Sequence, residues 1–258
     1  MKVDTRKNFY VIAMDAGAEN PAIPTWASRC SNPSDLDTAS DTNVTLRNIS
    51  EVPGTFQLHN VLSPVEAQRL IHFTESLGFL EDAAVSLPRS IRHNHSLTWI
   101  ADDVTNDIIW QRCQSAISTA EIPGIRQKPV GLNARFRFYR YQKGDYFSPH
   151  TDGSWPGSKI INQELVHNAY HDRWSQMSFL LFLSDNYQGG ATQFYVSDVG
   201  PLEPARQSSQ AKIIDVRTPL GGALCFPHGN HPLHCRHSSE QILSGTKYII
   251  RTDLLFSY

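Results

Sequence analysis

His150 and Asp152 stand two residues apart in "YFSPHTDGS", shortly after a strand-like segment, "NARFRFYRY". In an extended strand the side chains of residues i and i+2 point to the same face, with Cα atoms roughly 6–7 Å apart. An imidazole and a carboxylate placed in this way can bind one divalent metal ion. The pair alone is weak evidence, because polar residues at a solvated strand end produce the same pattern.

A third ligand has to come from another part of the chain. The stretch "FPHGNHPLHCRHSSEQILSGTK" offers four histidines, His228, His231, His234 and His237. Only His237 lies ten residues before a lysine, Lys247, that opens a strand-like segment, "KYIIRTDLLF".

Together these residues resemble the 2-oxoglutarate- and iron-dependent dioxygenases, in particular the prolyl 4-hydroxylase-like branch. The family order is Tyr-x-x-Gly-x-x-Tyr-x-x-His-x-Asp, then Gly-Gly-x-Thr-x-Phe, then a His with a Lys ten positions later. The match covers about residues 135–256, nearly half of the chain. The matching positions are Tyr141, Gly144, Phe147 (where the family often has Tyr), His150, Asp152, Gly189, Gly190, Thr192, Phe194, His237, Gly245 and Lys247.

The resemblance implies that His150, Asp152 and His237 hold Fe(II). Two neutral imidazoles and one carboxylate on one face of an octahedral ferrous ion leave three positions open. In the family these take 2-oxoglutarate and O2, and ascorbate serves as a reductant. The products are succinate, carbon dioxide and a hydroxylated substrate, without a separate acid or base. Because related halogenases lack the carboxylate ligand, Asp152 favours hydroxylation.

The resemblance also places the cosubstrate. The far carboxylate of 2-oxoglutarate needs a cation, and Lys247 fits as a point charge with three donors. Tyr141 matches the family tyrosine that helps to hold the cosubstrate, and Thr192 is a further candidate. Arg251 is a second candidate cation for the cosubstrate or the substrate.

Strand parity places further charges inside the predicted barrel. The face that carries Tyr141 also carries Arg137 and Arg135. The face that carries Lys247 also carries Arg251 and Asp253. Buried charge is costly unless it is paired or used. These residues therefore form either an internal network that braces the barrel or part of a substrate site. Prolyl hydroxylases commonly have Trp where Asp253 stands, and this departure argues against peptidyl-proline as the substrate.

The segment "PRSIRHNHSLTWIADD", residues 88–103, is rich in polar groups and leads into the first barrel strands. It provides two further substrate candidates, Arg92 and Asn94. A solvated loop is the alternative interpretation.

Other histidines allow a competing metal site. His231 and His234 lie three residues apart, close to Cys225 and Cys235. A structural zinc site needs a second closely spaced pair of ligands, and the sequence supplies none.

The elements that must position these residues change character along the chain. Ser63-Pro64-Val65-Glu66 has the form of a capping box with Pro at the first helical position, and it predicts a helix over residues 63–78. A second helix is predicted after Asp102 or Asp103. From Gly131 onward, short segments rich in β-branched and aromatic residues alternate with Gly, Pro, Asn and Asp. We predict a mainly β (α+β) fold, a double-stranded β-helix (jelly-roll, cupin-like) core with N-terminal helices packed outside.

Residues 1–52 are rich in Ser, Thr, Asn, Asp and Pro from residue 21 onward and predict a loosely ordered extension before a domain at 53–258. The net charge of -2 gives no electrostatic argument for nucleic acid or an anionic membrane. Four scattered cysteines favour a reducing compartment. No segment has the length of a membrane span or a signal sequence, so a cytoplasmic location is expected. The oligomeric state is left open.

The function expected from the sequence is an oxidoreductase that uses Fe(II) and 2-oxoglutarate to hydroxylate a protein side chain, as in the prolyl hydroxylases, or a small molecule. Two alternatives stay open. One is a cupin-like metal-binding protein without redox chemistry. The other is a catalytically idle sensor that binds iron and 2-oxoglutarate without turnover.

Overall fold

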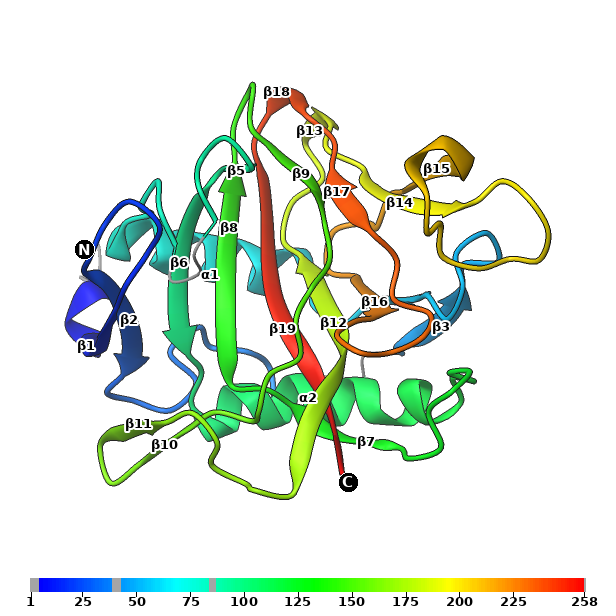
Figure 1. Cartoon of the computed structure of the whole chain (residues 1–258). Coiled ribbons are helices and arrows are strands. Elements are labelled where there is room, and N and C mark those ends of the chain that lie inside the picture. Colours follow the sequence, from blue (N-terminus) through cyan, green and yellow to red (C-terminus); the bar gives the residue numbers. More distant parts are fainter. Residues whose placement is uncertain (1–4, 39–42, 84–86, 258) are drawn as a thin grey trace.

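The computed structural model describes residues 5–38, 43–83 and 87–257 (Figure 1). Its helices are α1 Pro64–Leu77 and α2 Asp103–Ser118, with short 3-10 helices at Thr5–Asn8 and Ser208–Gln210. The strands are β1 Phe9–Asp15, β2 Ile23–Ser28, β3 Thr45–Asn48, β4 Phe56–His59, β5 Arg92–His93, β6 His95–Ile100, β7 Pro129–Leu132, β8 Arg135–Tyr141, β9 Tyr146–His150, β10 Lys159–Ile161, β11 Glu164–Val166, β12 Arg173–Phe182, β13 Tyr187–Gly189, β14 Thr192–Ser197, β15 Ala211–Val216, β16 Ala223–Pro227, β17 His237–Ser239, β18 Ile242–Gly245 and β19 Lys247–Ser257.

A large sheet forms one wall of the core, in the order β1-β2-β6-β8-β19-β12-β16-β4-β3, with β7 also paired to β19. A smaller sheet, in the order β15-β14-β17-β9-β5, forms the opposite wall. Apolar side chains from both sheets meet between them, among them Leu180 and Ile249 from the large sheet and Phe147, Phe194 and Val196 from the small one. The predicted mainly β fold with a jelly-roll core is confirmed.

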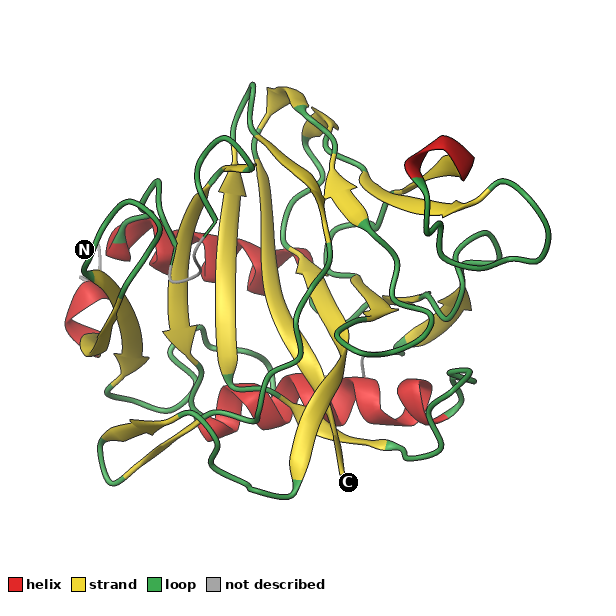
Figure 2. Ribbon diagram, in the orientation of Figure 1, coloured by secondary structure: helices red, strands yellow, loops and turns green. Residues whose placement is uncertain are grey.

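Both predicted helices form and cover the outer face of the large sheet (Figure 2). At the start of α1, the Ser63 hydroxyl accepts a hydrogen bond from the Glu66 N–H, and the Glu66 carboxylate accepts one from the Ser63 N–H. This reciprocal capping satisfies two backbone donors that the first helical turn would leave unpaired. Phe73 of α1 packs edge-on against Trp99 and Phe138 of the sheet. No helix in the described part of the chain has both the length and the apolar character needed to cross a membrane.

The N-terminal segment differs from its prediction. Residues 1–52 were expected to be a loosely ordered extension, but β1 and β2 form a hairpin, and β2 pairs in parallel with β6 through Trp26 and Trp99. β3 likewise pairs with β4 at the other edge of the large sheet. Leu36 and Val52 are almost fully buried. The expectation was wrong for these strands, because tertiary pairing with a buried neighbour ordered segments that have little periodicity of their own. A boundary at residue 53 stays a prediction.

Candidate active site

Pairing between β9 and β17 sets the geometry of the site. His150, the last residue of β9, lies directly opposite His237, the first residue of β17. Asp152 lies two residues beyond the end of β9. The register therefore brings the two imidazoles together, although they are far apart in the sequence, and the adjacent carboxylate completes the group.

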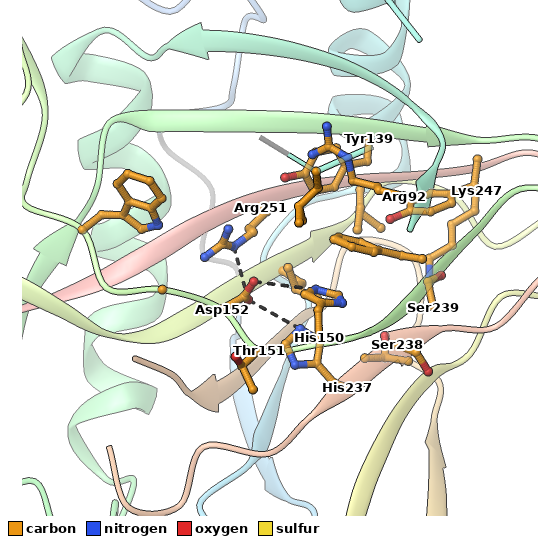
Figure 3. Close-up of a pocket in the computed structure, with 18 residues that line it drawn as sticks. Arg92, Tyr139, His150, Thr151, Asp152, His237, Ser238, Ser239, Lys247 and Arg251 are labelled. Carbon is orange, nitrogen blue, oxygen red and sulfur yellow. Dashed lines mark hydrogen bonds and ion pairs between the residues drawn. The ribbon is translucent and has the colours of Figure 1, made fainter. Parts of the chain in front are cut away.

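The three side chains converge on one point (Figure 3). His150 Nε2 lies 3.8 Å from Asp152 Oδ1, and His237 Nε2 lies 3.6 Å from Asp152 Oδ2. The three ligand atoms all lie within 4.8 Å of one another. Two atoms that each bind an ion at about 2.0–2.2 Å can be at most about 4.4 Å apart, so both measured ligand–ligand distances fit a shared ion.

Hydrogen bonds orient the imidazoles toward this point. His150 Nδ1 donates to the Ser148 carbonyl at 2.8 Å, and His237 Nδ1 donates to the Cys235 carbonyl at 3.2 Å. Each bond fixes the tautomer that leaves the Nε2 lone pair free for a metal. The Phe147 ring stacks on His150 with ring centroids 3.5 Å apart and restricts its rotation.

The protonation states suit metal binding. Burial lowers the pKa of His150 to about 3 and also lowers the pKa of His237, so both imidazoles are neutral at pH 7. Burial alone would raise the pKa of Asp152, but the Arg251 guanidinium and the hydrogen bond from Ser178 hold it well below its usual range. Two neutral imidazoles and one carboxylate are the donor set of non-haem ferrous sites, so these residues fit Fe(II).

Lys247 lies at another wall of the same cavity. Its side chain is 1% exposed, and its Nζ donates to the Gly190 carbonyl at 2.7 Å and to the Ser239 hydroxyl at 3.2 Å. No ion pair joins it to a carboxylate within the described residues. Burial lowers the pKa of Lys247 to about 7. A buried ammonium without a counter-ion fits the far carboxylate of 2-oxoglutarate, which would supply the missing charge.

The cavity has a volume of about 230 Å³. Of the residues predicted for metal, cosubstrate or substrate, the following line it: Arg92, Tyr141, His150, Asp152, Thr192, His237, Lys247 and Arg251. Tyr141 and Lys247 face each other across β8 and β19, as strand parity predicts, and Lys247 Nζ lies 5.4 Å from the centre of the Tyr141 ring. The assignment of Tyr141 and Thr192 to the cosubstrate stays a prediction.

Arg251 is held by carboxylates on both sides. Its Nε lies 3.3 Å from Asp152 Oδ2, and its Nη2 lies 3.3 Å from Asp253 Oδ1. Burial works against the charge, but the two carboxylates raise the pKa of Arg251 above its ordinary value. This pairing favours a role in bracing the metal-binding carboxylate. Direct contact with the cosubstrate stays a prediction.

Three predicted substrate residues do not line this cavity. Asp253 is fully buried and lies 3.9 Å from Arg137 Nη1, which continues the ion-pair chain from Arg251. Arg137 instead lines a neighbouring cavity, where its guanidinium carbon lies 5.1 Å from the centre of the Trp155 ring. Asn94 is almost fully buried, at 1% exposed, and does not line the cavity.

His228 and two serines of β12, Ser175 and Ser178, form a hydrogen-bonded group behind the metal-binding carboxylate that was not predicted from the sequence. Ser178 donates to Asp152 Oδ2 at 2.6 Å, so its oxygen accepts from His228 Nδ1 at 2.9 Å. His228 Nε2 in turn accepts from the Ser175 hydroxyl at 2.9 Å. This series of hydrogen bonds fixes the orientation of the metal-binding carboxylate of Asp152. Ser175 and Ser178 lie three residues apart in β12, with a register shift after Ser175, so regular alternation along the strand gives no signal for this pair.

The alternative zinc site does not form. Among the described residues, His150, Asp152 and His237 are the one group of three metal-binding side chains that lie close enough to share an ion. His231 and His234 instead contact each other through a hydrogen bond from His234 Nδ1 to the His231 carbonyl at 2.8 Å.

Comparison with known proteins supports the fold. No protein-family profile and no curated protein matches the chain. A prolyl hydroxylase from Trichoplax adhaerens, solved with a peptide of hypoxia inducible factor, has a TM-score of 0.50 and 15% identity over 79% of this chain and 84% of that one. The viral collagen prolyl hydroxylase of Paramecium Bursaria Chlorella virus-1 scores 0.48 at 13% identity, covering 82% of this chain and all of that one. A prolyl-4-hydroxylase from Pseudomonas putida scores 0.48 at 14% identity, covering 78% and 92%.

The Trichoplax comparison establishes that this chain has the fold of a prolyl hydroxylase. The fold and the convergence of two histidines and an aspartate define a class of protein, a jelly-roll domain with a candidate metal site between its two sheets.

Proposed function

We propose that this protein is an Fe(II)- and 2-oxoglutarate-dependent dioxygenase that hydroxylates its substrate. One observation carries the proposal: the triad of His150, Asp152 and His237 opens into the same cavity as Lys247, a buried ammonium with no carboxylate partner in the described chain. A metal-binding domain without the cosubstrate would have no use for this costly charge.

When bound, ferrous iron supplies the redox chemistry that couples decarboxylation of 2-oxoglutarate to oxidation of a substrate C–H bond. His150, Asp152 and His237 would hold the ion. Ser178 and Arg251 fix the Asp152 carboxylate through contacts of 2.6 and 3.3 Å to its Oδ2.

The remaining walls of the cavity position the organic ligands. Lys247 would bind the far carboxylate of 2-oxoglutarate, and its contacts with Gly190 and Ser239 hold the ammonium in place. The rings of Tyr139 and Phe147 line the cavity and exclude water from the reacting groups. The retained Asp152 carboxylate favours hydroxylation over halogenation.

The partner required in every turnover is therefore 2-oxoglutarate, together with a primary substrate that is either a peptide or a small molecule. The charge balance of the chain argues against nucleic acid. A reducing compartment such as the cytoplasm suits the four free cysteines, Cys30, Cys113, Cys225 and Cys235.

The test is succinate release from 2-oxoglutarate with Fe(II), O2 and ascorbate, in wild type and in His150→Ala. His72→Ala is the matched control, because His72 is exposed on α1. We expect wild type and His72→Ala to release succinate above background and His150→Ala to release none. Equal release by wild type and His150→Ala refutes the metal assignment. Tight binding of 2-oxoglutarate without turnover would support the sensor alternative.

A further inference from the structure

Charges along the cavity wall provide information on the primary substrate. Three cationic side chains line the cavity, Arg92, Lys247 and Arg251, against one carboxylate, Asp152. Arg251 is already paired with Asp152 and Asp253. Lys247 is assigned to the cosubstrate in the proposed function, on which this step rests. Arg92 therefore remains without an anionic partner in the part of the chain that the structure describes.

Arg92 is well buried, and its side chain has no polar partner among the described residues. Its side chain is 3% exposed, and its guanidinium makes no hydrogen bond or ion pair with any residue that the structure describes. A buried guanidinium cannot lose its charge, so its desolvation cost must be offset by a ligand or by stacking on aromatic rings. Figure 3 shows Arg92 on the side of the cavity where Tyr139 lies.

Aromatic rings hold the guanidinium in place. The central carbon of Arg92 lies 5.6 Å from the centre of the Tyr139 ring and 5.9 Å from the centre of the Phe147 ring. Both distances are within the range of about 6 Å for cation–π attraction. These contacts restrain the side chain but satisfy none of its five N–H donors, and such a fork matches the two oxygens of a carboxylate.

The strands fix the distance from Arg92 to the metal ligands. Arg92 lies in β5 and pairs with Phe147 of β9, three residues before His150 on the same strand. An anion bound by Arg92 would thus be held at a constant position relative to His150 and Asp152. This arrangement can direct one C–H bond of a bound molecule toward the site between them.

The cavity is small. Its volume of about 230 Å³ is below the roughly 300–1,000 Å³ typical of pockets for drug-sized ligands, and the cosubstrate takes part of it. We infer that the primary substrate is a small carboxylic acid whose carboxylate pairs with Arg92. This narrows the proposed function from a peptide or small molecule to one chemical class.

The experiment compares acids with their own amides. A panel of the protein amino acids and short aliphatic and aromatic acids, each with its primary amide, is tested for binding by saturation-transfer NMR. The protein is wild type loaded with Zn(II) and 2-oxoglutarate, so that no turnover occurs. We expect at least one acid to bind at least about 30-fold more tightly than its amide, and the same acid to stimulate succinate release with Fe(II).

Two variants test the residue itself. Arg92→Met should reduce the affinity of that acid to the level of its amide, and Arg92→Lys, which keeps the charge without the fork, should give an intermediate affinity. Arg69→Met is the control, because Arg69 is an exposed arginine on α1. Thermal melts followed by circular dichroism confirm that each variant is folded, and the acid-to-amide comparison in wild type needs no variant.

The outcomes separate this inference from the proposed function. Equal affinity for acids and amides, or no binding by any acid in the panel, overturns the inference, as does an unchanged acid affinity in folded Arg92→Met. Binding of 2-oxoglutarate is measured separately and should be the same in wild type and Arg92→Met. Its absence in wild type would refute the proposed function, while the acid-to-amide ratio would still decide the role of Arg92.

Discussion

Replacing Lys247 with methionine should weaken cosubstrate binding and stabilise the protein at the same time. The buried ammonium is the proposed partner of the far carboxylate of 2-oxoglutarate. Loss of one member of a buried charge pair costs about 2–5 kcal/mol, which corresponds to roughly 30- to 5,000-fold weaker binding. Methionine has a similar length and can fill the same space.

The gain in stability follows from the cost of keeping this lysine. Burial lowers its pKa from 10.5 to about 7, and at about 1.36 kcal/mol for each pH unit the buried charge costs on the order of 4–5 kcal/mol in the ligand-free protein. The substitution also leaves the Gly190 carbonyl without its donor, at a cost of about 1–3 kcal/mol. We therefore expect the free energy of unfolding to rise by roughly 1–4 kcal/mol.

Two measurements check this prediction: isothermal titration calorimetry with 2-oxoglutarate on the Mn(II)-loaded protein without O2, and urea unfolding of the ligand-free protein. Lys159→Met is the matched control, because Lys159 pairs with Asp103 at the surface. An unchanged affinity for 2-oxoglutarate in Lys247→Met would move the anchor to Arg251. A free energy of unfolding lower than that of wild type would show that the buried charge of Lys247 does not destabilise the ligand-free protein.

Three other changes have defined outcomes. His237→Ala should abolish stoichiometric Mn(II) binding in a calorimetric titration, whereas the control His167→Ala, at an exposed position, should leave it intact. One bound metal ion per chain in both variants would disprove the assignment of His237 as a metal ligand. Because only protonated Lys247 attracts the anion, the affinity for 2-oxoglutarate should fall by up to about tenfold per pH unit as the pH rises above about 7. Calorimetric titrations in buffers of different ionisation enthalpy should show that binding takes up a proton. An affinity that does not change from pH 7 to 9 would contradict this prediction. Ligand-free stability should rise with pH between about 7 and 10.5, since the unfolded state binds the extra proton there. Glu66→Gln breaks a buried ion pair with Arg112 at 2.7 Å and should lower the free energy of unfolding in urea by about 3–5 kcal/mol. Because the pKa of Glu66 is lowered from 4.5 to about 2, the stabilisation by this pair should be present above pH 4.5 and lost as the pH falls toward 2. A decrease in the free energy of unfolding of less than about 1 kcal/mol would show that the pair is solvated.

The parts of the site that sequence could predict depend on local periodicity. Alternation along β8 and β19 correctly placed Tyr141 and Lys247 on the interior face, opposite each other. The capping box at Ser63 correctly predicted where α1 begins. Both signals arise within a few residues, where backbone geometry alone decides which way a side chain points.

Other features depend on distances between segments, which periodicity does not contain. Parity placed Arg251 inside the barrel but could not show that its guanidinium reaches Asp152. His228 gave no signal for its contact with Ser178, because the two strands become neighbours only after folding. The pairing of β2 with β6 was not predicted either, because "IPTWAS" contains a proline and shows no regular alternation of apolar and polar residues.

The hairpin of β1 and β2 has a consequence for the solubility of the protein. Through its parallel pairing with β6, β2 satisfies backbone groups that would otherwise lie at an open sheet edge beside Trp99 and Ile100. Unpaired edges of this kind recruit strands from other molecules and promote aggregation. A recombinant form trimmed to begin after Ser28 would keep every proposed metal and cosubstrate ligand, yet it would present this edge to its neighbours in solution. The first strands therefore protect the edge of the large sheet, which carries Lys247 and Arg251 on β19.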